Sequence, residues 1–60
     1  MEYIIQNVEE KTFVKVNRTL SAGIKFLKIF ESESDAQEYI DANLPDNEAL
    51  QIIKYEGFTS

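Results

Sequence analysis

The sequence has no cysteine and no histidine among its 60 residues, and its two glycines stand apart. Without cysteine, neither a disulfide framework nor a thiolate metal site can form. The chain also lacks the commonest general base and the thiol nucleophile. The isolated Gly23 and Gly57 do not make a glycine-rich phosphate loop. We therefore predict no metal, no cofactor and no enzymatic activity.

Lys and Arg are scarce, because six of them stand against eleven Asp and Glu, and the formal net charge is −5. This balance argues against double-stranded nucleic acid, whose phosphates are neutralised by Lys and Arg. It is compatible with a basic protein partner, or with solubility alone. A nucleic-acid partner is therefore not expected.

Long hydrophobic runs are also missing, since no stretch approaches the roughly 20 apolar residues of a membrane-spanning helix. The segment Met1–Ile5 is too short for a signal peptide, and Glu2 stands where such a signal carries positive charge. We expect a cytoplasmic protein with no membrane partner. Its length predicts a single domain, residues 1–60, with a thin core that a partner surface would help to stabilise.

Four segments have the β-branched and aromatic content of strands, and one has helical spacing of apolar residues. The strands are predicted at Tyr3–Val8, Thr12–Val16, Ile24–Phe30 and Ala49–Glu56, and the helix at Glu33–Asn43. The order β-β-β-α-β predicts an α+β fold in two layers. We expect a four-stranded, mostly antiparallel sheet with one helix packed on one face.

The start of the helix has two candidate caps, because Ser32 and Ser34 can each accept a hydrogen bond from a free backbone N–H of the first turn. The end is set by Pro45, which disfavours helical geometry at the residue before it. Four apolar residues share one helix face and are expected to face the sheet: Ala36, Tyr39, Ile40 and Leu44.

Alternation along the strands divides their residues between two faces. The face expected under the helix contains Ile4, Val8, Val14, Val16, Leu27, Ile29, Ile53 and Tyr55. The opposite face contains Tyr3, Ile5, Phe13, Lys15, Phe26, Lys28, Ile52 and Lys54. The third strand is ambiguous, because both of its faces carry apolar residues. One helix does not cover four strands, so the open face is either an interface or lies under residues 17–23 and Phe58.

The open face supplies our candidates for protein binding, which combine aromatic rings with lysines: Phe13, Lys15, Phe26, Lys28 and Lys54. Such a surface is also typical of platforms that stack the bases of single-stranded nucleic acid. The acidic net charge and the near absence of Arg favour a protein contact instead.

A second candidate is an acidic ridge on the outer helix face, made of Asp35, Glu38 and Asp41. A row of carboxylates can imitate phosphates and occupy the nucleic-acid groove of a basic protein. The alternative is a solvated outer face, which any surface helix requires.

The apolar hairpin is followed by Phe30-Glu31-Ser32, then by Ala36 and Tyr39-Ile40 in the helix and Ile52-Ile53 in the last strand. This layout resembles that of small proteins encoded by bacteriophages and prophages, although many of those also have a tryptophan or a glycine-rich turn. The resemblance implies stoichiometric inhibition of a host enzyme or defence system, in the host cytoplasm.

Our leading hypothesis is a non-enzymatic protein-binding module, a phage-type modulator or inhibitor whose partner is a host protein. Acidic nucleic-acid mimicry is one mechanism for it. The alternatives are a structural homodimer formed with a second copy of the chain, and single-stranded nucleic-acid binding by the open sheet face.

Overall fold

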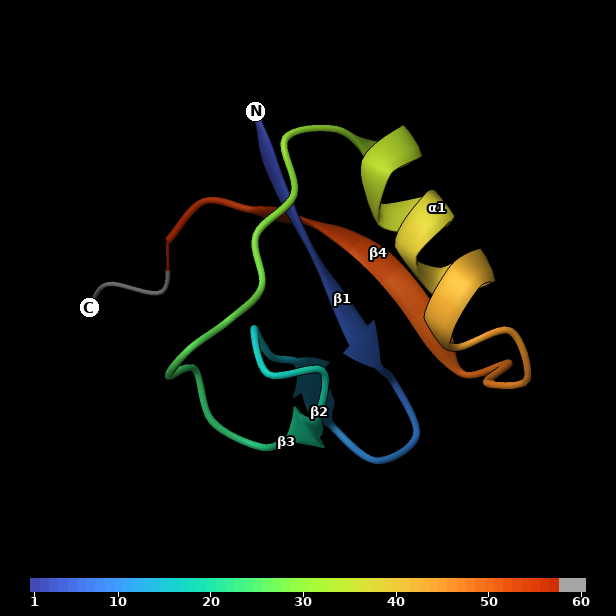
Figure 1. The fold of residues 1–60 in the computed structure, drawn as a ribbon. Coiled ribbons are helices and arrows are strands. Elements are labelled where there is room, and N and C mark those ends of the chain that lie inside the picture. The colour runs from blue at the N-terminus through green and yellow to red at the C-terminus, as the bar shows by residue number, and fades with distance from the viewer. Residues whose placement is uncertain (58–60) are drawn as a thin grey trace.

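The computed structural model describes residues 1–57 of the chain, and its fold is a sheet with one helix (Figure 1). The sheet has four strands in the order β3-β2-β1-β4, and every pairing is antiparallel. The elements are β1 (Glu2–Asn7), β2 (Thr12–Val14), β3 (Leu20–Ser21), α1 (Glu33–Asn43) and β4 (Leu50–Tyr55). The predicted α+β fold with a four-stranded sheet and one helix is therefore confirmed.

The helix has the predicted boundaries and one of the two predicted caps. Ser32 is the N-cap, because its hydroxyl accepts a hydrogen bond of 3.1 Å from the backbone N–H of Asp35. At the other end, the N–H of Leu44 donates to the carbonyl of Ile40 at 2.7 Å, and Pro45 follows. The expected inner face is also confirmed, since Ala36 is buried and the other three residues pack against the core.

The turn between β1 and β2 fixes which residues share a sheet face. The side-chain oxygen of Asn7 accepts hydrogen bonds from the backbone N–H groups of Glu9 and Glu10. The backbone carbonyl of Asn7 accepts a third from the N–H of Lys11. The resulting register places Asn7 opposite Thr12. Residues that face each other across an antiparallel pair lie on the same side. Even-numbered residues of β1 therefore share a face with odd-numbered residues of β2.

This register corrects the predicted faces. The helix covers Tyr3, Ile5 and Ile52, which were expected on the open side, and Val14 joins them as predicted. Ile4, Ile53 and Tyr55 were predicted under the helix. Because side chains alternate along a strand, they lie on the face away from α1, which we call the far face. The prediction was wrong because it placed even-numbered residues of both strands on one face. The turn instead pairs each even-numbered residue of β1 with an odd-numbered residue of β2.

The predicted third strand, Ile24–Phe30, is also wrong. Strand β3 is Leu20–Ser21, and the later segment makes only two isolated antiparallel bridges, Leu27 with Lys15 and Phe30 with Tyr3. Strands β1 and β2 pair at only two residue positions and then diverge, so residues 26–30 lie between them, bonded to each in turn.

One left-handed backbone position interrupts that segment, Phe26 at φ +62°, and another directly precedes it, Gly23 at φ +91°. A continuous strand is incompatible with such dihedral angles. The expectation that Phe58 covers the open face lies outside the described residues.

Candidate protein-interaction site

The five residues predicted as one aromatic and lysine surface do not lie together. Phe13 and Lys15 follow the alternation of the far face, whereas Lys54 pairs with Tyr3 on the helix side. The ammonium of Lys28 lies 5.5 Å from the ring centre of Phe30 and 5.2 Å from that of Tyr39, also on the helix side.

Lys15 is not part of the surface, because it is only 4% exposed. Its ammonium donates to the carbonyl of Gly23 at 2.7 Å and to that of Lys25 at 3.1 Å. A buried ammonium needs such partners, because leaving water unpaired is costly. Lys15 therefore holds residues 23–25 over the end of the far face, and its role is internal.

Phe26 is the exposed aromatic residue of the predicted set, with 76% of its side chain accessible to solvent. Two other apolar side chains whose backbones lie near that of Phe26 are also exposed, Val16 at 58% and Ile24 at 50%. The N–H of Val16 donates to the carbonyl of Phe26 at 2.9 Å, which keeps their backbones adjacent. We call Val16, Ile24 and Phe26 the apolar knob.

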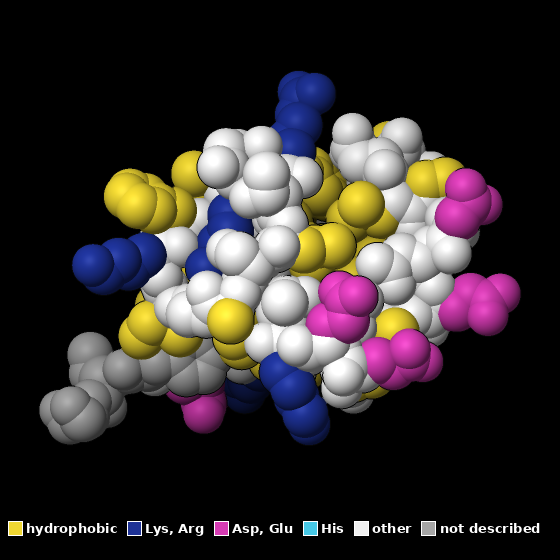
Figure 2. Space-filling model, turned by 90° about the horizontal axis from the view of Figure 1, so that it is seen from below, with side chains coloured by type: hydrophobic (Ala, Val, Ile, Leu, Met, Phe, Trp, Pro, Cys, Tyr) yellow, Lys and Arg dark blue, Asp and Glu magenta, His cyan; other side chains and the backbone are white. Residues whose placement is uncertain are grey.

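The charge around the apolar knob is positive although the chain as a whole is acidic. Residues 11–30 contain no Asp or Glu and hold five of the six basic residues: Lys11, Lys15, Arg18, Lys25 and Lys28. Arg18 and Lys25 are exposed near the knob in the chain. In Figure 2 most of the visible Asp and Glu side chains lie at the right, whereas Lys and Arg side chains lie at the left, the top and the bottom. This segregation of charge was not predicted, because net charge alone does not reveal it.

The predicted acidic ridge is present on α1, where Asp35, Glu38 and Asp41 are all exposed. One carboxylate oxygen of Asp41 accepts a hydrogen bond of 3.0 Å from the amide of Gln37, one turn earlier. The ridge points away from the sheet, because the opposite face of α1 carries the core residues.

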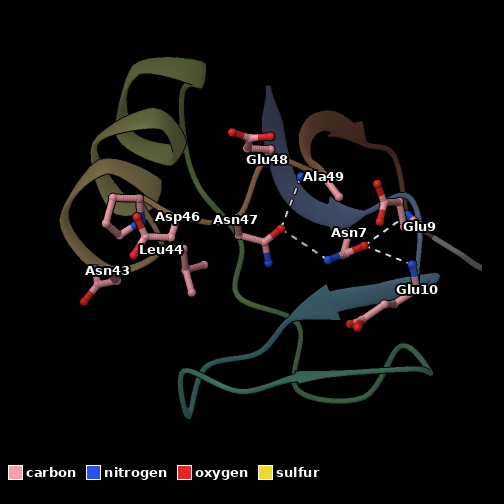
Figure 3. A pocket seen from close by; sticks show the side chains of 10 residues that line it. Asn7, Glu9, Glu10, Asn43, Leu44, Asp46, Asn47, Glu48 and Ala49 are labelled. Carbon is pink, nitrogen blue, oxygen red and sulfur yellow. Dashed lines mark hydrogen bonds between the residues drawn. The ribbon is translucent and has the colours of Figure 1, made fainter.

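A second feature was not predicted: an open hollow of about 640 Å³ between the β1–β2 turn and the loop from α1 to β4 (Figure 3). Asn7 and Asn47 hold the two loops together, since the Asn7 amide donates to the Asn47 side-chain oxygen at 3.3 Å. The same oxygen accepts from the N–H of Ala49. A sequence signal existed, because Asn in such loops commonly bonds neighbouring backbone.

The lining of the hollow combines apolar and acidic side chains. Its apolar part is Leu44, Pro45 and Ala49, and its acidic part is Glu9, Glu10, Asp46 and Glu48. Within residues 1–57, no group of three or more acidic side chains converges as metal ligands would. The hollow therefore offers both acidic and apolar side chains to a ligand.

The helix of the described region is neither long nor apolar enough to cross a membrane.

Comparison with known proteins gave no family model, no curated protein and no solved structure that matches this chain.

Proposed function

We propose that this chain is a non-enzymatic protein-binding module that contacts its partner through the apolar knob. The observation that carries the proposal is the state of Phe26, whose large aromatic side chain is 76% exposed on a left-handed backbone at φ +62°. Aromatic residues are enriched at protein interfaces and often provide the anchors that dominate binding energy.

The backbone at Phe26 strengthens this argument. Bulky residues are rare in the left-handed region, where Gly and Asn are preferred. Strained backbone tends to occur where function requires it. Phe26 also gains little from the core, because most of its side chain faces water. Its ring is therefore best explained by a contact outside the chain.

The class of partner that we propose is a host protein in the cytoplasm, bound stoichiometrically as by a phage-type modulator. The absence of His and Cys from the sequence supports binding over catalysis. The layout of hairpin, capped helix and final strand is the one on which the phage resemblance rests.

The exposed acidic ridge supports nucleic-acid mimicry as a second candidate mechanism. If it operates, replacing Asp35, Glu38 and Asp41 together by Asn or Gln should abolish partner binding. The knob variant should then bind normally.

The experiment is affinity capture from bacterial lysate with three immobilised proteins: the wild type, Phe26→Ser and the control Ile29→Ser. Ile29 is also exposed but lies outside the knob. We expect one specific protein to be retained by the wild type and the control and lost from Phe26→Ser. Equal retention by Phe26→Ser would contradict binding through the knob.

A further inference from the structure

We propose that the apolar knob of one copy docks into the hollow of a second copy, so that the chain assembles head to tail. This inference rests on the proposed function, because it uses the same knob as the binding surface. It names one partner by its chemistry: an open hollow lined by acidic and apolar side chains, which the chain itself carries.

The knob presents an apolar tip with positive neighbours. Phe26 is its most exposed side chain, Lys25 precedes it directly, and Arg18 lies in the preceding turn. Lys15 strengthens this geometry from within, since its bonds to Gly23 and Lys25 fix the backbone just before Phe26. A tip held in place loses less conformational entropy when it binds.

The hollow has the complementary chemistry. Its volume of about 640 Å³ falls within the usual range for ligand pockets. Leu44, Pro45 and Ala49 offer apolar contacts, and Glu9, Glu10, Asp46 and Glu48 make the lining negatively charged. The bonds from Asn7 to Asn47 and from Ala49 to Asn47 hold the two walls before any partner arrives.

The positions of knob and hollow decide the symmetry. The segment that carries Ile24 and Phe26 and the loop after α1 lie at opposite sides of the fold (Figure 1). Docking of one into the other is a heterologous contact, which leaves a free knob and a free hollow at the two ends. The assembly is therefore expected to grow with concentration and not to stop at a symmetric dimer.

The first test is sedimentation velocity of the wild type over a concentration series up to about 1 mM, where weak contacts become populated. We expect the mean mass to rise with concentration. The rise should diminish from about 0.1 M to about 1 M salt, because the Debye length falls from about 10 Å to about 3 Å. A monomer throughout the low-salt series would overturn the proposal.

The second test uses two variants that each damage one half of the contact. Phe26→Ser damages the knob, and the double change Asp46→Lys with Glu48→Lys damages the hollow. Each variant alone should associate at least about tenfold more weakly, as for a central anchor. An equimolar mixture should form a complex of two chains and stop there, because it contains one intact knob and one intact hollow.

Matched controls separate docking from general effects of the changes. Ile29→Ser removes an exposed apolar side chain outside the knob, and Glu38→Lys reverses a charge on α1 away from the hollow. Both should assemble like the wild type, and circular dichroism should show all variants folded. Head-to-tail docking would be overturned if the variant with Asp46→Lys and Glu48→Lys self-associated as strongly as the wild type. It would also be overturned if the equimolar mixture formed no complex.

This inference and the proposed function can fail separately. A wild type that stays monomeric while Phe26→Ser loses a captured host protein would overturn self-assembly and leave protein binding through the knob in place. Self-assembly of Phe26→Ser equal to that of the wild type would overturn docking through the knob, and equal capture of a host protein by the two would contradict the proposed function.

Discussion

The two faces of the sheet are covered in different ways. On one face, α1 buries Ala36 and packs Tyr39 and Ile40 against a core that includes Ile5. On the far face, residues 23–25 are held by the ammonium of Lys15, and the apolar side chains of Ile24 and Phe26 stay in water. The contacts of α1 with the sheet are apolar, whereas residues 23–25 are held by polar bonds to their backbone, and Ile4 is fully buried on that far face.

This difference separates stability from binding within a very small chain. The helix uses its apolar residues for the core, so its outer face is left with acids. In the segment 22–28, Leu27 is partly buried, but Ile24 and Phe26 stay exposed and are available for contact. Regions with few buried apolar contacts open at lower free-energy cost than the core. The bonds from Lys15 hold the backbone of residues 23–25 in place, but opening this segment should cost less free energy than opening the core.

Phe30 links the two regions, and its replacement should have the largest effect. Its ring centre lies 5.4 Å from that of Tyr39, and its backbone exchanges two hydrogen bonds with Tyr3. Phe30→Ala should cost about 3–5 kcal/mol through the cavity it leaves. In a domain this small, that loss should unfold most of the protein at room temperature.

Thermal unfolding followed by circular dichroism measures this effect, with Ile29→Ala as the neighbouring control. Ile29 is 41% exposed, so its loss should change the free energy of unfolding much less. Comparable destabilisation by the two changes would mean that the core does not depend on the Phe30–Tyr39 contact.

Lys15→Met should have the next largest effect, but a local one. It removes the ammonium that donates to the carbonyls of Gly23 and Lys25, at a cost of about 1–3 kcal/mol. Amide hydrogen exchange should speed up at Val16 and Lys28, whose N–H groups bond across this region, and not within α1. The exposed Lys54 gives a control, since Lys54→Met should leave exchange unchanged. Equal acceleration in α1 would show that the two covers unfold together.

Much of the helix-covered side could be predicted from the sequence because its signals are local. Ser32, the spacing of Ala36 to Leu44 and Pro45 define the helix without reference to the rest of the chain. The faces of the strands could not be predicted, because they depend on the register set by the turn at Asn7. A change of one residue in that register exchanges the faces.

The candidate site was less predictable than the fold. The apolar run from Ile24 to Phe30 has the composition of a strand, but its neighbours β1 and β2 diverge and allow only isolated bridges. Phe26 was predicted to belong to a surface of aromatic rings and lysines that the structure does not bring together, and its own side chain is exposed. The basic segment 11–30 was readable in the sequence, and the hollow was not, because it joins residues 7–10 to residues 43–49.

Ser32→Ala should have a moderate effect confined to the helical cover. Removing the hydroxyl that accepts from Asp35 should cost about 1 kcal/mol. Ser34→Ala is the matched control and should be nearly silent, because Ser34 lies within α1 and is exposed. Chemical denaturation of both variants measures the difference. A larger loss for Ser34→Ala would contradict the observed cap.

The smallest expected change in stability is a gain, at Phe26 itself. Asn adopts the left-handed region more readily than Phe, so Phe26→Asn should relieve strain and stabilise the fold by up to about 1 kcal/mol. Lys11→Asn, at φ +60° outside the knob, should stabilise by a similar amount. Chemical denaturation gives both values, and sedimentation gives the cost to association. Only Phe26→Asn should gain stability and lose self-association, because only there does a binding side chain occupy a strained position. A loss of stability in Phe26→Asn would instead mean that the ring supports the fold, and the argument for an external partner would lose its main observation.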